Sequence, residues 1–399
     1  MNPRKPVLLL ALAFSGFFLA AGTIGNQRLP PPYATPSADN HPDVVRQPAG
    51  ASLHVPAGFE IQQWATGFRA PRFLLRGGNG EILLTDSGGR EDGQGAVYVF
   101  PNEDPKARKE LIRGLTRPYG LALWKNYLYV AEPTSVKRYP YNPSNFTVGK
   151  GEQVISLAGF TQDHWTRSLL FDRAGQKLYV GVGSGANVET GEDPRRAAIN
   201  RYNPDGSGHE IFASGTRNPI GLHWYPNSDV LWAAVQERDD LGDNLVPDYF
   251  THVEQGGFYG WPYSYIGNHE DPRIKPQRPD LVNKAIVPDV LLPAHVAVLD
   301  FTFYTGNQFP SEYRGGAFLA FHGSWNRSQR DGYEVAFVPF KNGQPTAPAR
   351  DFVTGWMISP SNKDVWGRPV AVLEMKDGSL LISDDGGQKI WRVSYNGGR

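Results

Sequence analysis

A module that recurs six times along the chain constrains its fold more than any other feature. Each copy opens with a basic residue, continues with an apolar strand and a turn of Gly, Asn or Asp, and ends with a second apolar strand closed by acidic residues or glycine. Further strands expected over 96–100, 136–139 and 390–395 bring each module to four. The chain is therefore predicted to be all-β, a six-bladed β-propeller with four-stranded blades. The copies open at Arg72, Arg117, Arg167, Arg217, His295 and Arg368, the fifth being the most diverged.

The composition favours many turns between apolar strands. The chain holds 45 glycines and 33 prolines, 12% of its residues are aromatic, and sustained helical periodicity is absent. A two-sheet sandwich is the alternative architecture. Forty basic and forty acidic residues, with no block of either sign, give no indication of a nucleic-acid partner or an anionic membrane surface.

The N-terminus predicts export. Arg4 and Lys5 precede an apolar run over 7–21 that ends in small residues, which is the layout of a signal peptide over 1–22. The run is shorter than the ~20 residues of a membrane span, so we expect a periplasmic or secreted bacterial protein with no stable span after cleavage. An uncleaved anchor facing the periplasm is the alternative. Residues 23–51 are rich in proline and predict a linker, and 52–399 form the propeller domain.

The chain has no cysteine. This excludes disulfides, lipoprotein acylation and the covalent attachment of c-type haem through C-x-x-C-H. If the chain carries out redox chemistry, it would therefore need a separate electron acceptor, such as a quinone or a cytochrome.

The six opening basic residues are predicted to form a ring. The innermost strands of a propeller line its axis, so equivalent ends of the modules converge there. Guanidinium groups bind carboxylates in a bidentate way, and a ring of them suits a polyanionic ligand. Some members are expected instead to pair with acidic residues of neighbouring blades, and we assign Arg72 and Arg117 mainly to that role.

Two loops carry candidate site residues. His164 ends a loop three residues before Arg167, where an imidazole could act as a general base; an ordinary surface histidine is the alternative. Arg217 and Asn218 open the fourth module, and Pro219 forces Asn218 into an extended conformation. Gln236 ends the second strand of that module and precedes the oxygen-rich stretch 237–244, which suits Ca²⁺ unless it is simply a solvated acidic loop.

These residues resemble a known family. Asp163-His164, Arg217-Asn218-Pro219, Gln236 and the run Tyr259-Gly260-Trp261-Pro262 are similar to motifs of the soluble sugar dehydrogenases that use pyrroloquinoline quinone (PQQ). The stretch 237–249 and the run His322-Gly323-Ser324-Trp325-Asn326-Arg327 resemble more specifically the sorbosone and pyranose dehydrogenases. The resemblance covers residues 56–393.

The resemblance implies roles for individual residues. His164 would be the catalytic base, and Arg217 would stabilise the developing negative charge. The cofactor would contact Arg217, Asn218 and Gln236, with Arg368 on one of its carboxylates. Ca²⁺ would bind the backbone carbonyls of Glu237 and Arg238.

The chain departs from the family pattern at three places. Glu237-Arg238 stands where the aldose enzymes have Gly-Pro, Trp366 stands where they have a second arginine, and their fifth-blade lysine has no clear counterpart. His322, Trp325 and Arg327 lie in the neighbourhood of that lysine, so we expect His322 and Arg327 to contact the cofactor.

The implied reaction is the PQQ-dependent oxidation of a sugar or sugar aldehyde, of the aldose, pyranose or sorbosone type, by hydride transfer. No G-x-G-x-x-G motif supports a nicotinamide or flavin cofactor. One alternative is a Ca²⁺-dependent lactonase, which predicts axial carboxylates and asparagines without Arg217 or Arg368 in the pocket. The other is a non-catalytic binding propeller, in which His164 points into a blade.

Overall fold

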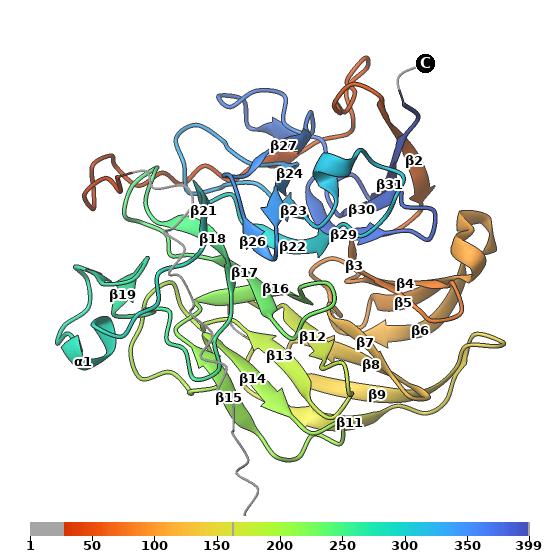
Figure 1. Cartoon of the computed structure of the whole chain (residues 1–399), viewed down its shortest axis with the longest axis horizontal. Coiled ribbons are helices and arrows are strands. Elements are labelled where there is room, and N and C mark those ends of the chain that lie inside the picture. The colour runs from red at the N-terminus through yellow and green to blue at the C-terminus, as the bar shows by residue number, and fades with distance from the viewer. Residues whose placement is uncertain (1–27, 162, 398–399) are drawn as a thin grey trace, which may run out of the picture.

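Six antiparallel sheets stand around a common centre in the computed structural model, which describes residues 28–161 and 163–397 (Figure 1). They follow one another around the centre in chain order, which confirms the six-bladed propeller. In the described part of the chain the helical segments are one short helix, α1 (Pro279–Val282), and three 3₁₀ turns. No helix there is long and apolar enough to cross a membrane.

The strands of each blade run outward from the axis. Blade 1 contains β3 (Pro71–Arg76), β4 (Ile82–Asp86), β5 (Gly95–Phe100) and β6 (Lys109–Leu115). Blade 2 contains β7 (Leu121–Trp124), β8 (Tyr127–Glu132), β9 (Ser135–Asn142), β10 (Thr147–Val148) and β11 (Glu152–Ser156). Blade 3 contains β12 (Arg167–Phe171), β13 (Leu178–Val182), β14 (Ala198–Tyr202) and β15 (Glu210–Ser214). In blade 2, β10 and β11 each pair with part of the long strand β9.

Blade 4 contains β16 (Asn218–Trp224), β17 (Leu231–Gln236), β18 (Pro247–His252) and β21 (Val290–Ala294). Blade 5 contains β22 (Val298–Phe303), β23 (Ala317–Phe321), β24 (Glu334–Val338) and β27 (Arg350–Val353). Blade 6 contains β29 (Pro369–Glu374), β30 (Leu380–Asp384), β31 (Lys389–Tyr395) and β2 (Phe59–Thr66). Short ladders outside the blades are β1 (Asp43–Val44) with β28 (Asp364–Val365), β19 (Ser264–Tyr265) with β20 (His269–Glu270), and β25 (Phe340–Lys341) with β26 (Gln344–Pro345).

The core lies between neighbouring blades. Successive side chains of a strand point to opposite faces of its sheet. In β4, Leu83 packs with blade 2, where Leu128 lies, and Leu84 packs with blade 6, where Leu381 lies. Both faces of the strand are thus buried, and Leu83 and Leu84 are 0% exposed. This explains why the modules are continuous apolar runs rather than alternating ones.

The first strand of the propeller domain to join a blade, β2, completes the last blade and closes the ring. Strand β2 pairs antiparallel with β31, so that Phe59 faces Tyr395 and Thr66 faces Lys389. The last blade is therefore built from both ends of the propeller domain, and the outer edge of β31 is covered. The repeat did not reveal this strand, because β2 precedes the first copy and belongs to the sixth.

Residues 28–45, which we call the N-terminal strap, pack along the blades. The Asn40 amide donates to the Trp325 carbonyl (2.9 Å), and Arg330 Nη2 donates to the Asn40 carbonyl (2.8 Å). Strand β1, in the same segment, pairs in parallel with β28. A linker is expected over 23–51, but the strap within it is held against the propeller, because polar loop groups satisfy the backbone of this proline-rich segment. The expected signal peptide lies outside the described residues.

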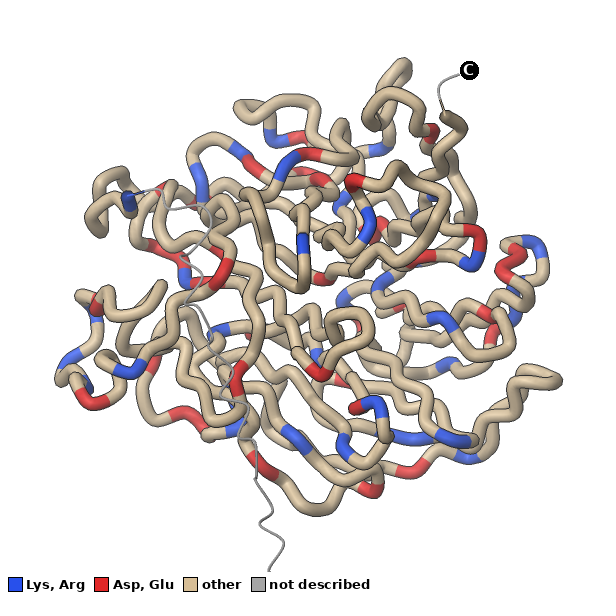
Figure 2. Tube along the Cα trace, viewed as in Figure 1, with Lys and Arg blue, Asp and Glu red and all other residues tan. Residues whose placement is uncertain are grey.

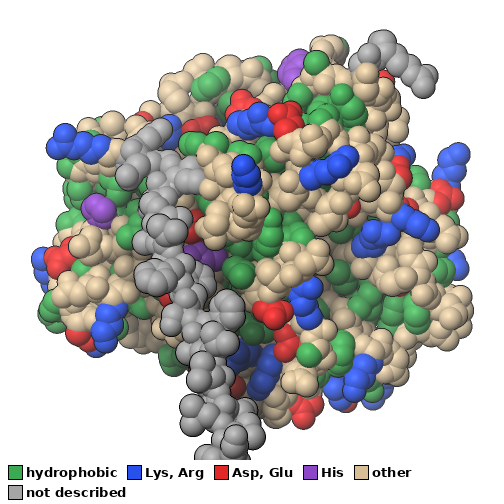
Figure 3. Space-filling model, in the orientation of Figure 1, with side chains coloured by type: hydrophobic (Ala, Val, Ile, Leu, Met, Phe, Trp, Pro, Cys, Tyr) green, Lys and Arg blue, Asp and Glu red, His purple; other side chains and the backbone are tan. Residues whose placement is uncertain are grey.

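Charged residues of both signs are interspersed along the described trace (Figure 2). The face shown in Figure 3 likewise mixes basic and acidic groups without a large patch of one sign. The net charge of zero is therefore spread evenly, as the sequence indicates.

Candidate active site

A cavity of about 420 Å³ lies on the propeller axis, at the end where the innermost strands begin. All six blades contribute to its wall. Among the residues that the sequence singles out, those lining it are His164, Asn218, Gln236, His322, Arg368, Arg72, Arg117 and Trp325. Residues that the sequence did not indicate, chiefly Trp165, Asp385 and the loop of Ser87, Gly89 and Arg90, also line it.

His164 is held in one tautomer. Its Nδ1 lies 2.9 Å from the Ser184 carbonyl oxygen, which can only accept, so Nδ1 carries the proton. The other ring nitrogen, Nε2, bonds no described residue and keeps its lone pair. Burial and then the positive charge of Arg217 lower the pKa of His164 to about 3. The imidazole is therefore neutral at working pH, as a general base must be before it accepts a proton.

Glycine is required beside this histidine. His164 itself adopts a left-handed backbone, with φ of 50°. A Cβ on Gly183 would lie 2.5 Å from the Cβ of His164 and 2.3 Å from Oδ1 of Asn218. The strand end at Gly183 thus leaves just enough room for the two side chains to approach each other.

We expect the buried neutral histidines to lower the stability of the protein in mild acid. Burial and then Arg368 lower the pKa of His322 to about 4, and His164 is lower still. Between about pH 6.5 and about pH 4 these two side chains therefore bind more protons in the unfolded chain than in the folded one, so their contribution to the free energy of unfolding falls as the pH falls. Asp248 and Glu334, whose pKa values are raised by burial, act in the opposite direction. Urea unfolding across this window should show a shallower fall for His164→Asn than for the wild type. An unchanged pH dependence in that variant would contradict the assignment.

Asn218 and Gln236 form one side of the pocket. They face each other across β16 and β17, and Asn218 Nδ2 donates to Gln236 Oε1 (3.0 Å). Gln236 Nε2 donates to the Val298 carbonyl (3.1 Å), which orients the amide. Oδ1 of Asn218 is buried and has no partner among the described residues.

Arg217 lies behind this side rather than in the cavity wall. Its Nη1 donates to the Glu237 carbonyl (2.5 Å), and its Nη2 donates to Asn187 and to Asp239 (both 3.0 Å). It acts on the pocket through its fixed charge, which contributes to the low pKa of His164.

The ring of basic residues divides into two groups. Arg72, Arg117 and Arg368 line the pocket. Arg167 is fully buried and donates to backbone carbonyls, including that of Pro133. His295 is also buried, and its Nδ1 lies 3.2 Å from Asp239. Three members therefore support the structure around the pocket and three line the pocket itself.

The pocket arginines differ in their partners. Arg72 pairs with Asp385 of blade 6, as expected for inter-blade pairing. Arg368 donates to the carbonyls of His322 (3.0 Å) and Gly323 (3.2 Å). Arg117 departs from the inter-blade pairing expected of it, because it forms no hydrogen bond or ion pair with any described residue. Its buried Nε is unpartnered, and its guanidinium lies 4.4 Å from the Trp165 ring centroid.

His322 and Asp385 pair on the opposite side. His322 Nε2 lies 2.8 Å from Asp385 Oδ1. Burial would raise the pKa of Asp385, but His322 and Arg72 outweigh it and hold that pKa well below its usual range. The signal in the sequence that could have revealed Asp385 is the acidic end of the last module, Asp384-Asp385. Arg327 instead lines a separate cavity and donates to the Ala294 carbonyl (3.3 Å).

Comparison with known proteins now identifies the family. A family model described as TrAA12-like matches residues 53–253 and 279–396. The chain belongs to the TrAA12-like family.

Two relatives show how far the likeness extends. An uncharacterised protein of Borreliella burgdorferi is 30% identical over 86% of this chain and 91% of its own length. The PQQ-dependent pyranose dehydrogenase of Coprinopsis cinerea is 32% identical over 87% of this chain, which spans 55% of that protein.

Solved structures agree on the fold. The holo form of the PQQ domain of that pyranose dehydrogenase has a TM-score of 0.75 at 20% identity, covering 87% of this chain and 98% of that one. A Trichoderma reesei protein of carbohydrate-active enzyme family AA12 has a TM-score of 0.73 at 23% identity, covering 86% and 98%.

Residues 254–278 fall between the two segments that match the TrAA12-like model, and they support the loop after Gln236. Arg238 is 0% exposed and ion-pairs with Glu237 (2.9 Å) and with Asp271 of this excursion (3.1 Å). Arg273 donates to the Asp239 carbonyl (2.8 Å). The Arg238 side chain is thus structural, whereas Glu237 uses Oε2 in these contacts and keeps Oε1 buried without a partner among the described residues.

Proposed function

We propose that this TrAA12-like protein oxidises a sugar or sugar aldehyde in the axial pocket with PQQ as cofactor. The observation that carries the proposal is the unpaired Arg117 guanidinium beside His164 in one cavity. Its Nε is buried without a hydrogen-bond partner in the described part of the chain, which costs free energy, and a ligand carboxylate would satisfy it.

The donor set fits PQQ, a planar tricarboxylate. Arg117 and Arg368 would bind its carboxylates, and Asn218 and Gln236 would offer amide groups to its polar edge. When bound, PQQ supplies the hydride acceptor. The relatives that carry the cofactor in their names support this choice.

The chain's own residues would handle the proton. Nε2 of His164 accepts the proton of the substrate hydroxyl, and the Ser184 carbonyl stabilises the imidazolium through Nδ1–H. Arg217 adds a fixed positive charge behind the pocket, where it favours the negative charge that develops during oxidation. The side chains of Trp165 and Trp325 also line the site.

The alternatives fit the pocket less well. A lactonase predicts axial carboxylates and asparagines with neither Arg217 nor Arg368 in the pocket. Arg217 does lie outside the cavity wall, but Arg368 lines it, and the carboxylate there, Asp385, is already paired with Arg72 and His322. A binding propeller predicts that His164 points into a blade, whereas it lines the cavity.

The test is reconstitution. Purified protein, incubated with PQQ and Ca²⁺, should reduce an artificial dye when sugars are added from a panel of aldoses, pyranoses and sorbosone. Hydrolysis of aldonolactones without any dye reduction would favour the lactonase instead.

Calcium binding by the carbonyls of Glu237 and Arg238 stays a prediction. Arg217 occupies one lone pair of the Glu237 carbonyl, and a carbonyl oxygen has two. The described residues contain no cluster of three or more acidic or histidine side chains suited to a metal, so a cation would depend on backbone oxygens and on the cofactor.

We expect EDTA treatment to lower both dye-reducing activity and thermal stability, and Ca²⁺ to restore them better than Mg²⁺, since Mg²⁺ requires a strict octahedron that irregular backbone oxygens rarely provide. Elemental analysis of the active enzyme checks this. An active holoenzyme that contains no metal would rule the ion out.

Export and the electron acceptor complete the proposal. We infer that the protein works in the periplasm or outside the cell. We also infer that it passes electrons to an external quinone or cytochrome, because the chain contains no haem-attachment motif.

A further inference from the structure

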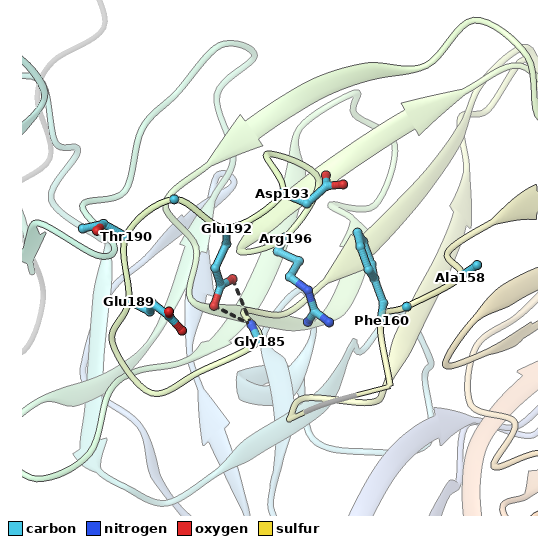
Figure 4. Close-up of a pocket in the computed structure, with 10 residues that line it drawn as sticks. Ala158, Phe160, Gly185, Glu189, Thr190, Glu192, Asp193 and Arg196 are labelled. Carbon is cyan, nitrogen blue, oxygen red and sulfur yellow. Dashed lines mark hydrogen bonds between the residues drawn. The ribbon is translucent and has the colours of Figure 1, made fainter.

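The loop between β13 and β14 holds the backbone against which His164 rests. The Ser184 carbonyl accepts from Nδ1 of His164 at 2.9 Å. The next amide, Gly185 N–H, donates to the Glu192 carboxylate, whose two oxygens both lie 2.9 Å away (Figure 4). Glu192 therefore contacts the amide end of the peptide group whose carbonyl end binds His164.

The two contacts belong to a single peptide unit. The carbonyl of Ser184 and the amide of Gly185 are opposite ends of one planar trans peptide group, so they point in opposite directions. Glu192 grips one end while His164 binds the other. Turning this peptide would break both hydrogen bonds at once. Nδ1 of His164 would keep only the Ser184 hydroxyl oxygen, which lies 3.0 Å away and can donate as well as accept, so the orientation of the peptide and the tautomer of His164 are coupled.

The charge of Glu192 adds to the geometry. A hydrogen bond to a carboxylate is stronger than one to a neutral acceptor, and a peptide that donates to an anion becomes a better acceptor at its carbonyl end. The effect at His164 resembles that of a carboxylate bonded directly to a catalytic imidazole, although here a peptide stands between them.

Glu192 does not face the axial pocket. It lines a separate cavity of about 260 Å³ together with Glu189, Arg196 and Phe160. Figure 4 shows the Glu192 side chain turned toward Gly185, and Glu189 makes no such contact. A direct role of Glu192 in binding the cofactor or the sugar is therefore excluded by its position.

We propose that Glu192 is a positioning residue for His164: through the Ser184–Gly185 peptide it holds the imidazole in the tautomer that leaves Nε2 free to accept the substrate proton. The inference rests on the proposed function only in that His164 is the base. The coupling itself is a property of the apoprotein.

Nitrogen-15 NMR of the histidine side chains in the apoprotein tests the coupling without any activity. The His164 signal is assigned by its loss in His164→Gln. The wild type should show the Nδ1–H tautomer, and Glu192→Ala should show a mixture of the two tautomers. Glu189→Ala, which removes a neighbouring carboxylate of the same loop, should match the wild type. A wild-type tautomer in Glu192→Ala overturns the proposal.

Kinetics of the reconstituted enzyme separate positioning from a general structural role. Glu192→Ala should lower kcat by about 10–100-fold, the range typical of residues that orient a functional ligand from behind, with KM and PQQ affinity unchanged. Glu192→Gln keeps an acceptor oxygen for Gly185 and should recover most of the loss. Wild-type kcat in Glu192→Ala, or an equal loss in Glu189→Ala, contradicts the proposal.

Two further outcomes are distinguishable. If Glu192→Ala does not fold, Glu192→Gln still tests the charge, because the weaker acceptor should move the His164 Nδ1–H proton resonance upfield; an unmoved resonance overturns the proposal. If the wild type never oxidises a sugar, the proposed function fails while the tautomer result still decides the coupling.

Discussion

Replacing His164 with alanine is expected to lower sugar-dependent dye reduction by about 10²–10⁴-fold, the usual cost of losing a general base. The pocket keeps Arg117, Arg368, Asn218 and Gln236 in this variant, so its affinity for PQQ should stay close to that of the wild type. Steady-state kinetics at saturating PQQ, together with a PQQ titration, measure both quantities.

A histidine elsewhere in the same blade provides the control. His209 lies beside the outer strand β15 and contacts Asn200 (2.8 Å), far from the lining of the axial pocket. His209→Ala should leave turnover unchanged. Full turnover by His164→Ala would remove that residue from the mechanism, and loss of PQQ binding would make it a cofactor ligand instead.

Replacing Arg117 with alanine is expected to weaken PQQ binding at least about tenfold while leaving the thermal stability unchanged. Losing one partner of a buried charge pair commonly costs about 2–5 kcal/mol, and about 1.4 kcal/mol corresponds to a factor of ten. Because Arg117 forms no hydrogen bond or ion pair with any described residue, its removal loses only the contact of its guanidinium with the Trp165 ring. Higher PQQ concentrations should recover the activity, unlike in His164→Ala.

Two further arginines calibrate this result. Arg368→Ala should also weaken PQQ binding at least about tenfold. Its loss also frees the carbonyls of His322 and Gly323, so some stability should be lost with it. Arg113→Ala, an exposed residue of blade 1, should change neither quantity. If Arg117→Ala and Arg368→Ala both bind PQQ as tightly as the wild type, the carboxylate sites lie elsewhere.

The repeat was enough to predict the propeller, and it placed the candidate site at the end of the axis where the cavity lies. Each module carries its basic residue at the same position, so convergence on the axis followed from the fold alone. It could not say which of these residues face the ligand. Arg72 and Arg117 occupy equivalent positions, yet only Arg72 meets an acidic partner, because Asp385 ends the neighbouring module on one side.

The repeat pattern of the sequence could not predict the contacts of segments that lie outside the repeat. Strand β2 and the N-terminal strap have no partner nearby in the sequence, and the strap is held by side chains such as Asn40 and Arg330 that lie about 290 residues apart. The pairing of Glu192 with Gly185 depends likewise on how one loop folds back on itself. Such contacts depend on tertiary structure and leave no period in the sequence.

The central claim is that the axial pocket brings PQQ and a sugar together beside His164. The most direct measurement is a single turnover without oxygen or dye: the apoprotein is loaded with one equivalent of PQQ and Ca²⁺, a sugar is added, and the absorbance of the bound cofactor is followed. We predict that the wild type converts the cofactor fully to its reduced spectrum and that His164→Ala binds it but leaves it oxidised over the same interval. A wild-type protein that binds no PQQ, or binds it and leaves it oxidised with every sugar of the panel, would contradict the account.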